Sequence, residues 1–226
     1  ELYGSELELK MHIIELLEAL NFLHNDAKTV SLGVSPENIF KTMDGRWKLG
    51  GFVFSTQLIN TDTGTSNNID FSTTDCPLRS YPSLYYSSPE VVCIPSKCFY
   101  ASDIFSLGLI IVSILESNHK QRANNILTFS NYSAFKDGII RTMNDISMLS
   151  FIPVNLKPLL DRILNIDNSF RPICNEISAS SWLNDPFLQT IKYLDSLSEK
   201  EMSQQQTFLK GLQNIILKFE DRVLKS

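Results

Sequence analysis

The sequence has little cysteine, little histidine and no excess of basic charge. Its four cysteines form no Cys-x-x-Cys pair and it has three histidines, so we expect neither a disulfide framework nor a structural zinc site. This cysteine usage fits a reducing, cytoplasmic compartment. The formal net charge of −5 argues against a nucleic-acid groove and against direct binding to an anionic membrane surface.

A long uninterrupted apolar run is also missing. The longest run, residues 104–115, is broken by Ser106, Gly108 and Ser113, and it is shorter than the roughly 20 residues that a membrane-spanning helix needs. We therefore predict no transmembrane segment. No targeting signal is visible, and because the chain begins at Glu1 rather than Met, we expect it to be a piece of a longer protein.

The bulk composition predicts a globular protein of one domain or slightly more. The chain has 226 residues, 43% of them hydrophobic and 20% charged, which is enough to bury a sizeable core. Residues 61–74 differ, because Ile69 and Phe71 are the only large apolar side chains among Thr, Ser, Asn and Asp. Such a stretch predicts a mobile loop. A merely solvated loop is the simpler interpretation, and phosphorylation of it is the alternative.

Helical periodicity is strongest at the beginning of the chain. After a capping box that starts at Ser5, apolar residues recur at spacings of three and four through Leu9, Ile13, Leu16, Leu20 and Leu23, which predicts a core helix ending at Asn25-Asp26. Ser35-Pro36 then marks a turn. Asp44-Gly45 lies between the short apolar segments 39–42 and 47–49, which predicts a β-hairpin.

Short motifs along the chain resemble those of the protein kinases, in the same order. Pro36-Glu37-Asn38 resembles the end of the catalytic loop, and the hairpin after it leads to Gly50-Gly51-Phe52 where kinases have Asp-Phe-Gly. Further on, Ser88-Pro89-Glu90 resembles the Ala-Pro-Glu motif of kinases, and the segment from Asp103 to Gly108 resembles the start of their buried central helix. Phe170-Arg171-Pro172 resembles the Arg-Pro that kinases have after a later helix and loop. The resemblance covers about residues 5–182 and implies the C-terminal lobe of a kinase.

The resemblance also locates the residues that catalysis requires, and they are replaced. Gly33 stands where kinases have the catalytic Asp, Ser35 where they have Lys, and Gly51 where they have the magnesium-binding Asp. Asn38 is the one remnant of the metal site, and a neutral amide alone is a poor magnesium ligand. We therefore predict an inactive kinase-like protein, or pseudokinase, that binds neither ATP nor magnesium.

The residues with structural roles in kinases are kept. The resemblance implies that Glu90 and Arg171 form a buried ion pair and that Asp103 binds backbone amides of the catalytic loop. The resemblance also implies that Phe52 is the apolar residue that lies between the usual positions of the two lobes. A retained scaffold without catalytic groups is the pattern expected of an interaction module.

The last part of the chain carries two further helical patterns. Asp185-Pro186 predicts a helix start, a polar break is expected over 196–206, and apolar residues recur from Phe208 to Phe219. Extra helices packed on the lobe are one interpretation. The segments Phe208-Leu209-Lys210-Gly211-Leu212 and Phe219-Glu220-Asp221-Arg222-Val223-Leu224 instead resemble the post-kinase region of the Scy-like (SCYL) pseudokinases, and Ser31-Leu32-Gly33 and Gly50-Gly51-Phe52 resemble that family too. The expected fold is mainly α: a kinase-like C-terminal lobe with a small β-hairpin over 1–184, then the start of a HEAT-type helical solenoid over 185–226.

Three functional hypotheses follow. The resemblance to the SCYL family implies a cytoplasmic scaffold or adaptor in vesicle trafficking, associated with Golgi or endosomal coats through protein partners. The alternative is a divergent serine/threonine kinase that keeps ATP binding or weak phosphotransfer, with a replacement carboxylate from Asp62, Asp70 or Asp75. A third is a nucleotide-independent allosteric partner of an active kinase, which the sequence neither supports nor excludes.

Overall fold

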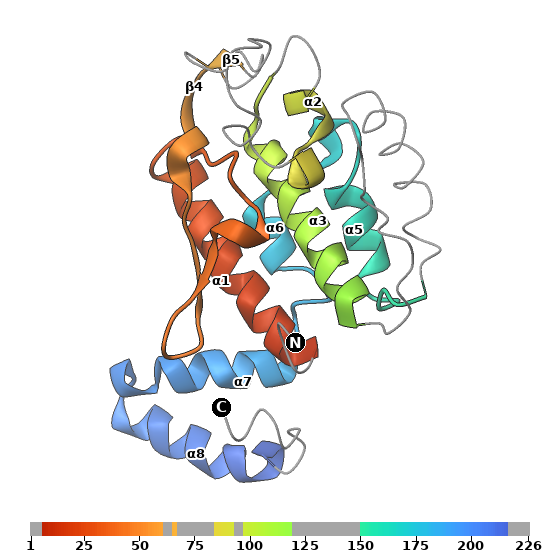
Figure 1. Ribbon diagram of the computed structural model, residues 1–226. Helices are drawn as coiled ribbons and strands as arrows, with labels where there is room; N and C mark the ends of the chain where they lie inside the picture. The colour runs from red at the N-terminus through yellow and green to blue at the C-terminus, as the bar shows by residue number, and fades with distance from the viewer. Residues whose placement is uncertain (1–5, 61–64, 67–83, 93–96, 119–149, 217–226) are drawn as a thin grey trace.

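The computed structural model describes residues 6–60, 65–66, 84–92, 97–118 and 150–216, and these ranges form a mainly helical lobe with two further helices at one end (Figure 1). The helices are α1 (Glu6–Asn25), α2 (Pro89–Val92), α3 (Tyr100–Asn118), α5 (Lys157–Ile163), α6 (Cys174–Ser178), α7 (Pro186–Asp195) and α8 (Met202–Ile216). The strands are β1 (Thr29–Val30), β2 (Ile39–Lys41), β3 (Trp47–Leu49), β4 (Thr56–Asn60) and β5 (Thr65–Ser66).

The core forms around α1 and α3. The apolar face predicted for α1 is buried, including Leu9, Ile13 and Leu20. On α3 the residues from Ile104 to Val112 are almost all buried, and Leu160 and Ile163 of α5 join the same cluster. Gly108 allows α3 and α5 to approach closely, because a Cβ atom there would collide with Ile163 and Leu164. The predicted core helices are confirmed.

Helix α3 is also apolar enough to be compared with a membrane span. By length and composition the window Tyr100–Ser117 would suffice to cross a bilayer, yet 72% of it is buried inside the fold. Packing against α5, β1 and the 3₁₀ turn Leu84–Tyr86 accounts for its composition.

In the part of the chain that the structure describes, the strands form two small antiparallel sheets. The predicted hairpin is confirmed: β2 pairs with β3 through Ile39–Leu49, Phe40–Lys48 and Lys41–Trp47, and Gly45 turns at φ +84°, which favours glycine. A second sheet with the order β1-β4-β5 was not predicted. The predicted loop 61–74 lies outside the described residues except for Thr65–Ser66, where the prediction is wrong because the backbone pairs with β4.

Helices α7 and α8 lie at the end of the lobe where α1 begins (Figure 1). Asp185 accepts a hydrogen bond from the Phe187 amide at 2.9 Å and so caps α7, as Asp185-Pro186 predicted. Leu188 of α7 belongs to the core cluster of the lobe. The predicted polar break at 196–206 is wrong in its second half, because the helix-favouring Met and Gln residues from Met202 onward already belong to α8. Whether these helices begin a solenoid stays a prediction.

An ion pair attaches α7 to α1. Lys10 is buried, and its Nζ lies 3.0 Å from Asp185 Oδ2 and 3.1 Å from Glu6 Oε1. Trp182 donates from Nε1 to the same Glu6 oxygen at 3.1 Å. These contacts fix the start of α7 against the first turns of α1.

Candidate functional site

The loop between β1 and the 3₁₀ turn Pro36–Asn38 is the segment that resembles a catalytic loop, and it is held by one carboxylate. Asp103 on α3 is fully buried. Its Oδ2 accepts a hydrogen bond from the Ser31 amide and its Oδ1 one from the Leu32 amide, each at 2.8 Å. Leu32 has φ +53°, in the left-handed region that non-glycine residues rarely adopt. The two bonds to Asp103 hold this strained residue in place.

A histidine that the sequence analysis missed completes this contact. His24, in the last turn of α1, places Nε2 2.9 Å from Asp103 Oδ2, and its ring packs on Tyr100 with the centroids 4.9 Å apart. His24 follows Leu20 by four residues, so it continues the apolar face of α1. A polar side chain at a buried helical position needs a hydrogen-bonding partner. The position of His24 on the apolar face of α1 is therefore the sequence signal that could have indicated this contact.

Gly33, Asn38 and Gly51, which the sequence analysis placed at the lost catalytic positions, lie in direct contact. Asn38 Nδ2 donates to the Gly33 carbonyl oxygen at 2.8 Å. Gly51 has φ +70°, and a Cβ atom there would overlap the Asn38 amide group. A Cβ atom on Gly33 would lie 2.6 Å from the Gly51 carbonyl oxygen, closer than real Cβ contacts come. The three residues leave no space between them for a further side chain.

The same region offers little to a metal ion. Gly33 and Gly51, at the positions predicted to have lost their carboxylates, have no side chain that could bind a metal ion, and Asn38 offers a single neutral amide oxygen. Ser35, which was predicted to replace the catalytic-loop Lys, is buried. Within the ranges that the structure describes, no group of three or more His, Cys, Asp or Glu side chains could hold a metal ion.

Phe52, predicted as a structural residue, lies outside both hydrophobic clusters. It begins the short 3₁₀ turn Phe52–Phe54 and is 45% exposed. The turn follows the left-handed Gly51 and directs Phe52 to the surface of the described residues. Its predicted structural role, as the apolar residue between the usual positions of the two lobes, stays a prediction.

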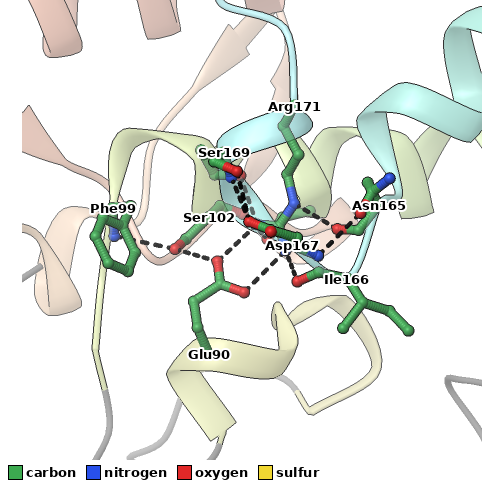
Figure 2. Close-up of polar contacts among 10 residues, drawn as sticks. Glu90, Phe99, Ser102, Asn165, Ile166, Asp167, Ser169 and Arg171 are labelled. Atoms are coloured by element: carbon green, nitrogen blue, oxygen red, sulfur yellow. Dashed lines mark hydrogen bonds and ion pairs between the residues drawn. The ribbon is translucent and has the colours of Figure 1, made fainter. Parts of the chain in front are cut away.

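The ion pair between Glu90 and Arg171 is present and extensively bonded (Figure 2). Arg171 Nη1 donates to Glu90 Oε1 at 2.6 Å and Nη2 donates to Oε2 at 2.9 Å. The remaining donors reach the carbonyl oxygens of Asn165, Ile166 and Ala101. This uses the full donor set of a guanidinium group, and it ties α2, α3 and the segment after α5 together.

Neighbouring groups complete the environment of the pair. Ser102 Oγ donates to Glu90 Oε1 at 2.7 Å, and the Arg171 guanidinium lies 4.7 Å from the Phe105 ring centroid. Burial is the largest influence on Glu90 and raises its pKa, but the hydrogen bonds and charge of Arg171, with the bond from Ser102, outweigh it. The pKa of Glu90 is therefore lower than its ordinary value. Glu90 is charged in the folded protein at neutral pH.

Comparison with known families agrees with this geometry. The family model described as "Protein kinase domain" matches residues 2–183, which include the loop held by Asp103 and the Glu90–Arg171 pair. The chain belongs to the protein kinase family.

Within that family the chain is similar to SCY1-like proteins, which confirms the predicted resemblance. It is 26% identical to mouse SCY1-like protein 2 over 97% of this chain and 23% of the relative. It is 28% identical to the protein kinase-like protein SCY1 of Saccharomyces cerevisiae over 94% of this chain and 27% of the relative. The mitosis inhibitor protein kinase SWE1 of the same yeast is 30% identical over 70% of this chain and 16% of its own length.

The chain is short relative to these proteins. It spans about a quarter of the length of the SCY1-like relatives that it matches, 23% in mouse and 27% in yeast. The family match covers residues 2–183, which form the kinase-like lobe.

Proposed function

We propose that this chain is the catalytically inactive, kinase-like part of a scaffold or adaptor protein. The observation that carries the proposal is the contact among Gly33, Asn38 and Gly51. The Asn38 side chain bonds the Gly33 carbonyl and lies against the left-handed Gly51. The space in which catalytic carboxylates would have to lie is occupied by backbone and by an amide.

The chemistry of phosphoryl transfer explains why this contact bears on function. The reaction depends on metal ions that neutralise the phosphates and on a carboxylate that orients the attacking hydroxyl. Gly33 and Gly51 supply neither carboxylate, and Ser35 supplies no positive charge. Asn38, the remaining candidate ligand, offers one neutral amide oxygen, which is a poor basis for a magnesium site without carboxylates beside it. We therefore expect no functional ATP or magnesium site.

The preserved framework supports the scaffold part of the proposal. Asp103 holds the loop and Arg171 holds Glu90, and neither contact needs a catalytic side chain. A fold that keeps its internal anchors without its reactive groups can still present surfaces to proteins. Helices α7 and α8, attached through Lys10 and Asp185, are where a HEAT-type solenoid would begin.

The cellular role rests on the resemblance to the SCYL family. That resemblance implies a cytoplasmic adaptor in vesicle trafficking that binds coat or adaptor proteins at Golgi or endosomal membranes. Membrane association would then come through protein partners. Proximity labelling by the longer protein in cells tests this: coat and adaptor proteins should be enriched, and labelling no different from that by a cytosolic control protein would contradict the role.

A phosphotransfer assay tests inactivity. The longer protein containing this chain is incubated with labelled ATP, magnesium and a generic protein substrate, beside an Asn38→Ala variant that is verified to be folded. We expect wild type and variant to give the same background label. Magnesium-dependent transfer that Asn38→Ala abolishes would overturn the proposal, because it would make Asn38 a working metal ligand.

A further inference from the structure

Three elements far apart in the sequence meet at a buried group of polar side chains behind the loop. Cys174 is the first residue of α6, His24 lies in the last turn of α1, and Asp103 lies in the first turn of α3. Cys174 Sγ lies 3.9 Å from His24 Nδ1, and His24 Nε2 lies 2.9 Å from Asp103 Oδ2. All three side chains are buried. Asp103 in turn accepts hydrogen bonds from the backbone amides of Ser31 and Leu32.

The direction of these hydrogen bonds follows from the protonation of the thiol. Burial, with a smaller contribution from the Asp103 charge, raises the pKa of Cys174 to about 12. The thiol therefore keeps its proton at neutral pH and can donate it. A thiol that donates to His24 Nδ1 requires that nitrogen to be unprotonated, so the ring proton is on Nε2, where it is donated to Asp103.

The arrangement must be distinguished from a nucleophilic Cys-His-Asp triad. The nucleophile of such a triad is the thiolate, whereas the pKa of Cys174 is raised and its side chain is buried among core residues. The group is therefore a static chain of hydrogen bonds and not a reactive centre.

We propose that the Cys174 thiol is a positioning group: by donating to Nδ1 it fixes the His24 ring with its proton on Nε2, and through Asp103 it holds the loop at Ser31 and Leu32. The chain of bonds links α6 to a loop that contains a left-handed leucine. This inference is independent of whether the protein transfers phosphate. It assigns a role to a residue that no kinase-like motif of the sequence included.

Nuclear magnetic resonance of histidine nitrogens tests the proposal directly, since the chain contains three histidines. In the wild-type chain we expect His24 to have its proton on Nε2 and an Nδ1 shift typical of a hydrogen-bonded acceptor. A proton on Nδ1 would overturn the proposal, because the thiol could not then be the donor. This measurement needs no substitution and so does not depend on whether a variant folds.

Variants separate the hydrogen bond from packing. Cys174→Ala removes the donor and Cys174→Ser restores one. Ile177→Val is the matched control, because Ile177 is buried on the same helix and in the same hydrophobic cluster and its truncation removes packing without removing a donor. In Cys174→Ala we expect the Nδ1 shift to become that of an unbonded nitrogen and amide exchange at Ser31 and Leu32 to quicken about fivefold, as for one lost hydrogen bond. Cys174→Ser should reverse both effects. Equal Nδ1 shifts and equal exchange in Cys174→Ala and Ile177→Val would overturn the proposal.

Discussion

The backbone oxygen of Gly51 lies where a side chain on Gly33 would have to begin, since a Cβ atom on Gly33 would come within 2.6 Å of it. By the proposed match to the kinase motifs, the two glycines stand where those motifs have their catalytic and metal-binding aspartates. The fold is closed at this point: a side chain could begin at neither glycine without moving its neighbours, and the Asn38 side chain contacts both.

This closure predicts that adding even one carbon at Gly33 destabilises the fold. We expect Gly33→Ala to lower the free energy of unfolding by about 1–3 kcal/mol, the usual cost of overpacking, and Gly33→Asp to lower it further without creating phosphotransfer activity. Chemical denaturation measures the first effect and an ATP-transfer assay the second. Gly211→Ala is the control: nothing lies within 4 Å of its Cβ position in α8, so helix propensity should stabilise it by up to about 1 kcal/mol. Equal stabilities of Gly33→Ala and wild type would contradict the closure.

The Glu90–Arg171 pair predicts a large effect of removing one partner. Glu90→Gln should lower the free energy of unfolding by about 3–5 kcal/mol, because it leaves the Arg171 charge buried without its counter-ion. The chain provides a matched exposed pair, Arg162 and Glu176, whose nitrogen and oxygen are 2.7 Å apart. Glu176→Gln should cost less than about 1 kcal/mol. Similar losses of unfolding free energy for the two variants, measured by urea denaturation, would contradict the expected difference between the buried and the exposed ion pair.

The lowered pKa of Glu90 predicts a pH dependence of stability. In the unfolded chain Glu90 has its ordinary pKa, 4.5, and in the folded protein its pKa is lower, so the unfolded state binds more protons at acid pH. The contribution of Glu90 should be complete well above pH 4.5 and decline as the pH falls from there through the folded pKa. The difference in the free energy of unfolding between wild type and Glu90→Gln should therefore become smaller as the pH is lowered from neutral to acid. A constant difference between them would contradict this origin.

Asp103 predicts a local effect on the loop. In Asp103→Asn one acceptor oxygen becomes an NH₂ group that faces the amide of Ser31 or Leu32, so a hydrogen bond is lost and a donor is left opposite a donor. We expect a loss of at least about 1–3 kcal/mol of stability, with faster hydrogen exchange at Ser31 and Leu32. Asp161→Asn, on the exposed face of α5, is the control and should leave exchange in the loop unchanged. Unaltered loop exchange in Asp103→Asn would show that the carboxylate does not hold the loop.

Local patterns predicted much of the fold, and long-range contacts were predicted only where a motif carried them. The periodicity of α1 and the Asp44-Gly45 turn indicated elements that form from nearby residues. The Glu90–Arg171 pair was inferred because both residues belong to recognisable motifs. The contact of His24 with Cys174, 150 residues apart, has no local signal. Strands β1 and β4 were missed because two to five residues carry too little periodicity, and their pairing is tertiary.

The measurement that tests the central claim most directly is thermal unfolding of the protein, extended to include whatever precedes this chain, with and without ATP and magnesium. A ligand that binds the native state must raise its stability, by about 2.7 kcal/mol at one hundred times the dissociation constant. An inactive scaffold without a nucleotide site predicts the same unfolding temperature in both conditions. A magnesium-dependent increase with ATP would contradict the account and favour a divergent kinase.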